Sequence, residues 1–298
     1  MKQKTRVATK TGLKQTDLKT LESTPPWEWP KSARETLQAV LLNRDAAASD
    51  RLLAAHLAGD YVAINDQLAG TLLGILGSAS EAPELRARAA ISLGPALEGA
   101  DMGDFDDPLD TPPISEEVFR KIQRFLRTLH QEESIPKEVR RSILEASVRS
   151  QEDWHAEAIR EAYASQDREW MQTAVYGMRY VRGFEEEILE ALKTSDEQIH
   201  IQAVKAAGSQ EVDAAWPHVF ALLENAATTP KPLLLAAIGA VANIRPDTDS
   251  LEMLNHLVDS EDRDVSDAAD EALSLAGAYT EFDEDAFLED EDASGWIN

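Results

Sequence analysis

One pattern recurs along the chain and constrains its fold more than any other feature. In DEQIHIQAVKAAGS (196–209) and DRDVSDAADEALSLAG (262–277), an acid precedes an apolar anchor and alanines follow. The pattern opens seven times, at Leu52, Leu85, Val139, Trp170, Ile199, Leu233 and Val265. These anchors are 33, 54, 31, 29, 34 and 32 residues apart, so five of the six separations agree. A unit of this size cannot bury its apolar faces alone, which predicts a stack of repeats.

Each copy has the pattern of two helices. In ELRARAAISLGPAL (84–97), the spacing of four between Leu85, Ala89, Leu93 and Leu97 predicts one helix with one apolar stripe. Partner helices are expected at 33–43, 61–76, 116–130, 153–164, 185–193, 214–226 and 250–258. Acids precede the anchored helices and are expected to cap them: Asp50, Glu84, Glu138, Asp167, Asp196 and Asp262. Strand and hairpin signals are lacking.

The segment LRARAAISLG (85–94) resembles the second helix of the HEAT-repeat family: an apolar residue, Arg, two variable positions, Ala–Ala, then Leu–Gly. The resemblance covers about residues 31–277 and also extends to the short repeats of bilin lyases. It implies an all-α fold, a right-handed α-solenoid of about seven HEAT-like antiparallel helix pairs, with the anchored helices on the concave side. Later copies depart from the motif at Ile143–Leu144, Leu234 and Ser266.

Three segments flank or interrupt the repeats. Residues 1–30 are basic, hold Trp27 and Trp29, and are expected to be partly mobile; the two tryptophans either cap the first repeat or dock a partner. The insert 99–114 is rich in Asp, yet its spacing does not match a calcium EF-loop, which favours a solvated loop. Residues 278–298 form an acidic tail.

Charge and composition narrow the partners. The net charge of −26 argues against nucleic acid and against an anionic membrane surface. The absence of cysteine excludes disulfides and thiolate chemistry and fits a cytoplasmic protein. No apolar run is long enough for a spanning helix, and the N-terminus lacks the apolar core of a secretory signal. We expect a monomer or weak self-association.

Motifs for catalysis are missing. No HExxH, Walker or GxSxG motif stands in a suitable context. Some HEAT-like proteins are iron hydroxylases built on His–Glu dipeptides, and here no His precedes a Glu. Others are DNA glycosylases with basic clamps, which the acidic charge opposes. The sequence therefore predicts no enzyme, no metal and no cofactor.

One strip of residues is a candidate binding surface. Positions two, three and six after each anchor point away from the core, and across the middle repeats they and their neighbours include Arg141, Gln172, Tyr176, Arg179 and Lys205. Because Tyr and Arg are favoured at interfaces, this strip is expected to bind an acidic peptide. Alternatively, arginines such as Arg86 and Arg140 tie adjacent repeats together through acids such as Asp167 and Asp196.

The tail adds a second candidate. Phe282, Phe287, Leu288 and Trp296 interleave with acids, which is typical either of a solvated tail or of a motif that docks on a partner. The sequence therefore predicts a non-catalytic scaffold that binds a partner polypeptide on its concave face. The alternative is an enzyme-maturation or lyase-type factor that acts on a cofactor-bearing protein.

Overall fold

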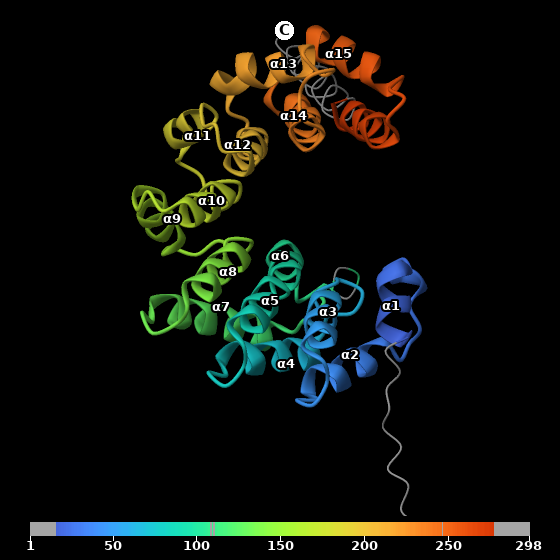
Figure 1. The fold of residues 1–298 in the computed structure, drawn as a ribbon, viewed down its shortest axis with the longest axis vertical. Coiled ribbons are helices and arrows are strands. Elements are labelled where there is room, and N and C mark those ends of the chain that lie inside the picture. The colour runs from blue at the N-terminus through green and yellow to red at the C-terminus, as the bar shows by residue number, and fades with distance from the viewer. Residues whose placement is uncertain (1–15, 108, 110, 246, 277–298) are drawn as a thin grey trace, which may run out of the picture. The chain divides into compact units, whose positions relative to one another are not determined.

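The computed structural model describes residues 16–107, 109, 111–245 and 247–276, and within these ranges the regular structure is entirely helical (Figure 1). The elements in chain order are α1 (Thr16–Ser23), η1 (Pro26–Glu28), α2 (Ala33–Leu42), α3 (Ala48–Ala58), α4 (Asp66–Gly77), α5 (Pro83–Ile91), α6 (Gly94–Met102), α7 (Glu116–Gln131), α8 (Lys137–Ser147), α9 (His155–Ala164), α10 (Arg168–Gly177), α11 (Glu185–Ala191), α12 (Glu197–Ser209), η2 (Asp213–Ala215), α13 (Trp216–Glu224), α14 (Lys231–Ile244) and α15 (Thr248–Val258). Residues 263–276 are also helical. The prediction of an all-α fold is confirmed.

The predicted helix pairs are present. The anchored helices are α3, α5, α8, α10, α12, α14 and the helix at 263–276, and their partners are α2, α4, α7, α9, α11, α13 and α15. The chain divides into two compact units, 1–152 and 153–298. In the first unit, α3 packs on α5 and α5 packs on α8. In the second unit, α10 packs on α12 and α12 packs on α14. Each unit is thus a stack of helix pairs.

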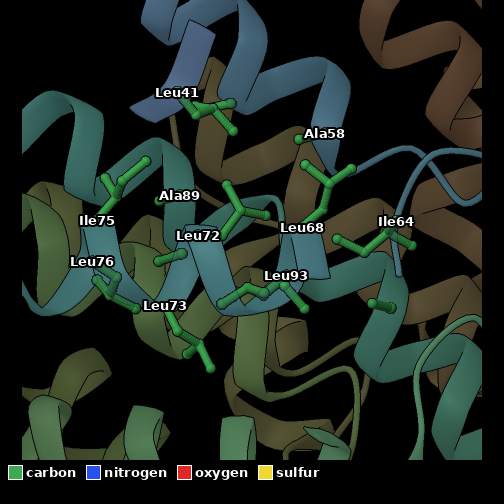
Figure 2. Close-up of a cluster of buried hydrophobic side chains, with 14 of the residues drawn as sticks. Leu41, Ala58, Ile64, Leu68, Leu72, Leu73, Ile75, Leu76, Ala89 and Leu93 are labelled. Atoms are coloured by element: carbon green, nitrogen blue, oxygen red, sulfur yellow. The ribbon is translucent and has the colours of Figure 1, made fainter. Parts of the chain in front are cut away.

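The core of each stack lies where anchored helices meet. Pairs of small or branched residues are fully buried at the same place in successive repeats: Ala54–Ala55, Ala89–Ala90, Ile143–Leu144, Ala174–Val175, Ala203–Val204 and Ala237–Ile238. In the first unit, leucines of α4 converge with Leu41 of α2 and Ala89 of α5 (Figure 2). Small side chains at the crossings let the helices approach closely.

Three arginines, of which Arg51 and Arg86 are buried and Arg140 is half-buried, fix the ends of the partner helices in the first unit. Nε of Arg86 donates to the carbonyl of Leu76 at 2.8 Å, and Nε of Arg140 donates to that of His130 at 2.8 Å. Arg51 donates in the same way to Leu41, at 2.9 Å from its second terminal nitrogen. Each arginine lies ten residues after its acceptor, which is a helix-terminal carbonyl without a partner inside its own helix.

This equivalence corrects the register of the first repeat. Arg51 matches Arg86, so the residue equivalent to the anchor Leu85 is Asp50 rather than Leu52. Leu52 is only half-buried, whereas Leu85 is buried. The expectation that arginines tie adjacent repeats through acids holds for Arg168, which donates to Asp196, whereas Nε of Arg86 and Nε of Arg140 each donate to a carbonyl within their own repeat.

The segment 84–97 forms two helices instead of the one predicted. Helix α5 ends at Ile91, and α6 begins at Gly94 with Pro95 in its first turn. A proline in a helix interior clashes with the carbonyl four residues earlier, here that of Ile91, so the helix breaks before it. Leu93 and Leu97 nevertheless remain fully buried.

The acids before the anchored helices play two roles. Asp167 and Asp196 cap α10 and α12 by accepting hydrogen bonds from backbone amides of the first turn, as expected. Asp50, Glu84 and Glu138 instead lie inside the first turns of their helices without capping them. Asp196 also accepts from Arg168, which joins the starts of two successive anchored helices.

The described part of the N-terminal segment, residues 16–30, contains packed side chains that its sequence does not indicate. Leu18 and Leu21 of α1 are buried, although no apolar stripe is evident there. Nε1 of Trp29 donates to the carbonyls of Leu21 at 2.9 Å and Thr24 at 2.8 Å, and its ring packs on the core. Trp27, in contrast, is 77% exposed. Only one of the two tryptophans therefore packs against the first repeat.

Candidate functional site

The predicted contact residues fall into both units. Arg141 lies in the first, whereas Gln172, Tyr176, Arg179 and Lys205 lie in the second. The candidate docking residues Phe282, Phe287, Leu288 and Trp296 lie outside the residues that the structure describes. The predicted strip is therefore divided between the two units.

In the first unit, Arg141 already has a partner. A terminal nitrogen of its guanidinium lies 3.7 Å from Oε1 of Glu145, one turn later on α8. Its side chain is only 16% exposed. The arginine is thus engaged within its own helix, which weakens its case as a contact for a partner.

A groove of about 470 Å³ lies in the first unit between α3, α5 and α8. It is lined by Leu52, Leu53, His56, Glu84, Ala87, Arg88, Ile91, Glu138 and Ser142. Most of these residues occupy positions two, three or six after the structural anchors Asp50, Leu85 and Val139. The positions that sequence reasoning assigned to the inner surface therefore line a concave surface here, once the register of the first repeat is corrected.

In the second unit, Arg179 lies against two tyrosines. Its guanidinium carbon is 5.5 Å from the ring centroid of Tyr176 and 5.6 Å from that of Tyr180. The two rings are 5.6 Å apart, and their hydroxyl oxygens are 3.4 Å apart. Helix α10 carries Tyr176, and Arg179 and Tyr180 follow in the turn after it. Cation–π contact of this kind holds a guanidinium in place without neutralising its charge.

The backbone of this turn is also fixed. Nε2 of Gln210, just after α12, donates to the carbonyl of Arg179 at 2.9 Å. Arg179 is therefore held at its side chain by α10 and at its backbone by the end of the neighbouring anchored helix.

Lys205 brings a second positive charge to the same place. It is exposed on α12, and partial desolvation together with the charge of Arg179 lowers the pKa of its ammonium group. Among the residues that the structure describes, neither Lys205 nor Arg179 forms an ion pair with a carboxylate. Among the described residues, Nε of Arg179 is buried and has no hydrogen-bond acceptor. The side-chain oxygen of Gln202 is likewise buried and has no hydrogen-bond donor.

We call Tyr176, Arg179, Tyr180 and Lys205 the Arg179 cluster. Gln172 lies one turn before Tyr176 on α10 and is half-buried, so it borders the cluster. Gln202 and Gln210 were not among the predicted residues. Gln202 occupies position three after Ile199, which is an inner-surface position, so the repeat register contains a signal for it. Gln210 lies past the repeat pattern, and only the structure places it here.

Two histidines meet elsewhere in the second unit. Nε2 of His200 on α12 lies 2.7 Å from Nε2 of His218 on α13. The described part of the chain contains no group of three or more His, Asp or Glu residues that fits a metal ion. The pair is therefore a hydrogen bond between two imidazoles that joins a partner helix to an anchored one.

Comparison with known proteins gives structural likeness only. No family model matches the chain, and no curated protein matches its sequence. Human deoxyhypusine hydroxylase is similar with a TM-score of 0.39 and 17% identity, over 88% of each chain. YibA of Escherichia coli is similar with a TM-score of 0.42 and 14% identity, over 92% of this chain and 99% of the other. An engineered protein is similar with a TM-score of 0.39 and 16% identity, over 88% and 77%.

These comparisons correct one expectation. The prediction that the chain is not an enzyme is contradicted, because one of the similar structures is a hydroxylase. Among the helices of the described residues, none is both long and apolar enough to cross a membrane.

Proposed function

We propose that the second unit binds an acidic segment of a partner polypeptide at the Arg179 cluster. The observation that carries this proposal is a pair of neighbouring cations, Arg179 and Lys205, without a described counter-ion in a chain whose net charge is −26. In such a chain carboxylates are abundant, so two cations that repel each other electrostatically, and of which neither pairs with a carboxylate among the described residues, are suited to a carboxylate supplied from outside.

The tyrosines define the kind of segment that fits. Tyr176 and Tyr180 hold the guanidinium of Arg179 in place and offer ring surface beside it. Arginine and tyrosine are the residue types that most often carry binding energy at interfaces. A segment in which acids alternate with aromatic or apolar residues would therefore gain both charge-assisted hydrogen bonds and ring contacts.

Access to Lys205 is supported by a glycine on the next anchored helix. Gly239 of α14 lies at position six after its anchor Leu233, as Lys205 does after Ile199. A Cβ atom added to Gly239 would meet no atom within 4 Å. The next repeat thus presents no side chain at the position equivalent to Lys205, which leaves the inner surface open there.

The sequence also supports proposals for the type of repeat, the class of partner, the location and the oligomeric state. The repeats are proposed to be of the HEAT type, on the strength of LRARAAISLG (85–94). The partner is proposed to be protein rather than nucleic acid or an anionic membrane, because a net charge of −26 repels phosphate. A cytoplasmic location is proposed because the chain has no cysteine, and a monomeric or weakly self-associating chain is proposed with it.

The test uses a synthetic fluorescent peptide in which glutamates alternate with phenylalanines, and fluorescence anisotropy with the full chain. Arg179→Ala is expected to weaken binding by about tenfold or more, because a hydrogen bond to a charged group contributes roughly 1.5–3 kcal/mol. Lys205→Ala is expected to weaken it less, since this ammonium is exposed. Lys193→Ala is the matched control, an exposed lysine of the same unit outside the cluster.

A second peptide with glutamine in place of glutamate controls for ring contacts alone. Equal affinity for the two peptides, or equal affinity of Arg179→Ala and Lys193→Ala for the acidic one, would refute the proposal. Circular dichroism of each variant establishes that the helices are intact.

A further inference from the structure

The C-terminal residues of the chain have the chemistry that the Arg179 cluster is suited to bind. Residues 281–292 hold eight acids and no base, and Phe282, Phe287 and Leu288 interleave with them. The cluster offers two cations without a described counter-ion and the rings of two tyrosines. The charge and ring surfaces are therefore complementary within a single chain and within the same unit.

We propose that residues 281–292 of the same chain occupy the Arg179 cluster when no partner is bound, so that a partner must displace them. This inference rests on the proposed function of the cluster. Residues 281–292 are then the acidic segment that the Arg179 cluster binds in the absence of a partner. Any other acidic segment has to compete with them.

The length of the chain permits this contact. The described helix ends at residue 276, and residues 289–292 follow it by 13–16 positions. An extended chain spans at most roughly 3.3–3.6 Å per residue, so these acids can reach up to about 45–55 Å from residue 276. Helix α10 and the helix at 263–276 belong to repeats three steps apart, and helices pack at about 8–10 Å, which gives a separation of about 30 Å.

Tethering favours the tail over free peptides. A short flexible linker holds its two ends at an effective concentration in the millimolar range. Contacts too weak to hold a free acidic peptide at micromolar concentration therefore suffice to hold the tail. Exposed charges are screened by salt, so occupancy is expected to fall as ionic strength rises.

Zero-length carbodiimide coupling of the full chain, followed by peptide mass spectrometry, tests the inference. The reagent joins a lysine amine to a carboxylate that it contacts. We expect Lys205 to couple to a carboxylate within 281–292 in the monomer fraction, several-fold more often than the exposed Lys193 does. Lys231 is the internal standard, because its Nζ already lies 2.8 Å from Oδ1 of Asp262 and 2.7 Å from Oδ2 of Asp264.

Two variants test whether the coupling of Lys205 depends on the tail acids and on Arg179. A chain with Glu289→Gln, Asp290→Asn, Glu291→Gln and Asp292→Asn is expected to lose most of the Lys205–tail product and to keep the Lys231 product. Arg179→Ala is expected to lower the Lys205–tail product several-fold, because one of the two cations is gone. Coupling of the tail to Lys193 as often as to Lys205, or products found only between two molecules, would overturn the inference.

The outcomes separate this inference from the proposed function. If Arg179→Ala weakens binding of the acidic peptide while the tail does not couple to Lys205, the function stands and the inference fails. If the peptide binding is unchanged and the tail does not couple, both fail. If the tail couples, the tail variant is expected to bind the acidic peptide more tightly than the natural chain, and unchanged affinity would count against competition.

Discussion

His200 and His218 share a hydrogen bond between their Nε2 atoms, 2.7 Å apart, although eighteen residues separate them in the chain. Burial lowers the pKa of both imidazoles, and the neighbouring His218 lowers that of His200 further. Below pH 6.5 the unfolded chain therefore takes up protons that the folded one does not, and stability falls with pH. We expect thermal melts of the second unit to move to lower temperature from pH 7 to pH 5, and His218→Asn to flatten that dependence. An identical slope in the variant would contradict this.

His130 makes a corresponding prediction for the first unit. Burial, with a contribution from the charge of Arg140, lowers the pKa of His130 from 6.5 to about 4. Between these values the unfolded state binds more protons, so stability declines as pH falls, by up to roughly 3 kcal/mol in total. Urea unfolding of His130→Gln between pH 7 and pH 4 is expected to lack this decline. His56→Gln, at an exposed histidine of the same unit, should retain it.

The arginine–carbonyl bonds predict a contrast on a single helix. Arg86 is buried and donates to the carbonyl of Leu76, whereas Arg88, two residues later on α5, is exposed. Arg86→Met leaves that carbonyl without its partner and is expected to lower the free energy of unfolding by about 1–3 kcal/mol. Arg88→Met is expected to change it by less than about 0.5 kcal/mol. The urea unfolding midpoint is expected to be lower for Arg86→Met than for Arg88→Met. Equal midpoints would contradict this prediction.

Two glycines are expected to respond oppositely to alanine. A Cβ added to Gly208 of α12 would lie 2.7 Å from Cα of Ala240, so α12 and α14 would have to separate, at a cost of about 1–3 kcal/mol. A Cβ added to Gly239 would meet nothing, and a helical glycine is about 1 kcal/mol less favourable than alanine. Melting temperatures should therefore fall for Gly208→Ala and rise for Gly239→Ala. A fall for both would show that Gly239 is packed.

Much of the fold follows from apolar spacing. The period of the anchors predicts the helix pairs, because a helix that buries one stripe repeats its apolar residues every three to four positions. Local exceptions are missed for physical reasons. Leu52 resembles the anchor of the first repeat because it is apolar, whereas Asp50, the residue that is structurally equivalent to Leu85, is an acid. Pro95 splits a segment whose apolar stripe continues unbroken on either side.

The site is predicted less completely than the fold. The repeat positions predict Tyr176 and Lys205 as surface residues, and Arg179 as their neighbour past a helix end. Nothing in the sequence shows that Arg179 lies on two rings or that Arg141 is engaged by Glu145. Nothing in the sequence indicates that His200 and His218 meet, because eighteen residues separate them. The packing of one helix on another brings them together, and such contacts depend on where each helix ends.

The arginines that donate to helix-terminal carbonyls in the first unit also limit how its repeats can be recombined. At the equivalent position the second unit has Met171, His200, Leu234 and Ser266, and Ser266 reaches only the carbonyl of Val258, at 2.7 Å and eight residues back. A helix transplanted from the second unit into the first would leave a carbonyl in the interior without a donor. A helix moved the other way would bring a guanidinium into a site shaped for a shorter side chain. The repeats of this chain share a pattern, but they are not interchangeable. A designer who wishes to lengthen the chain should therefore duplicate a repeat within its own unit rather than move one from the other unit.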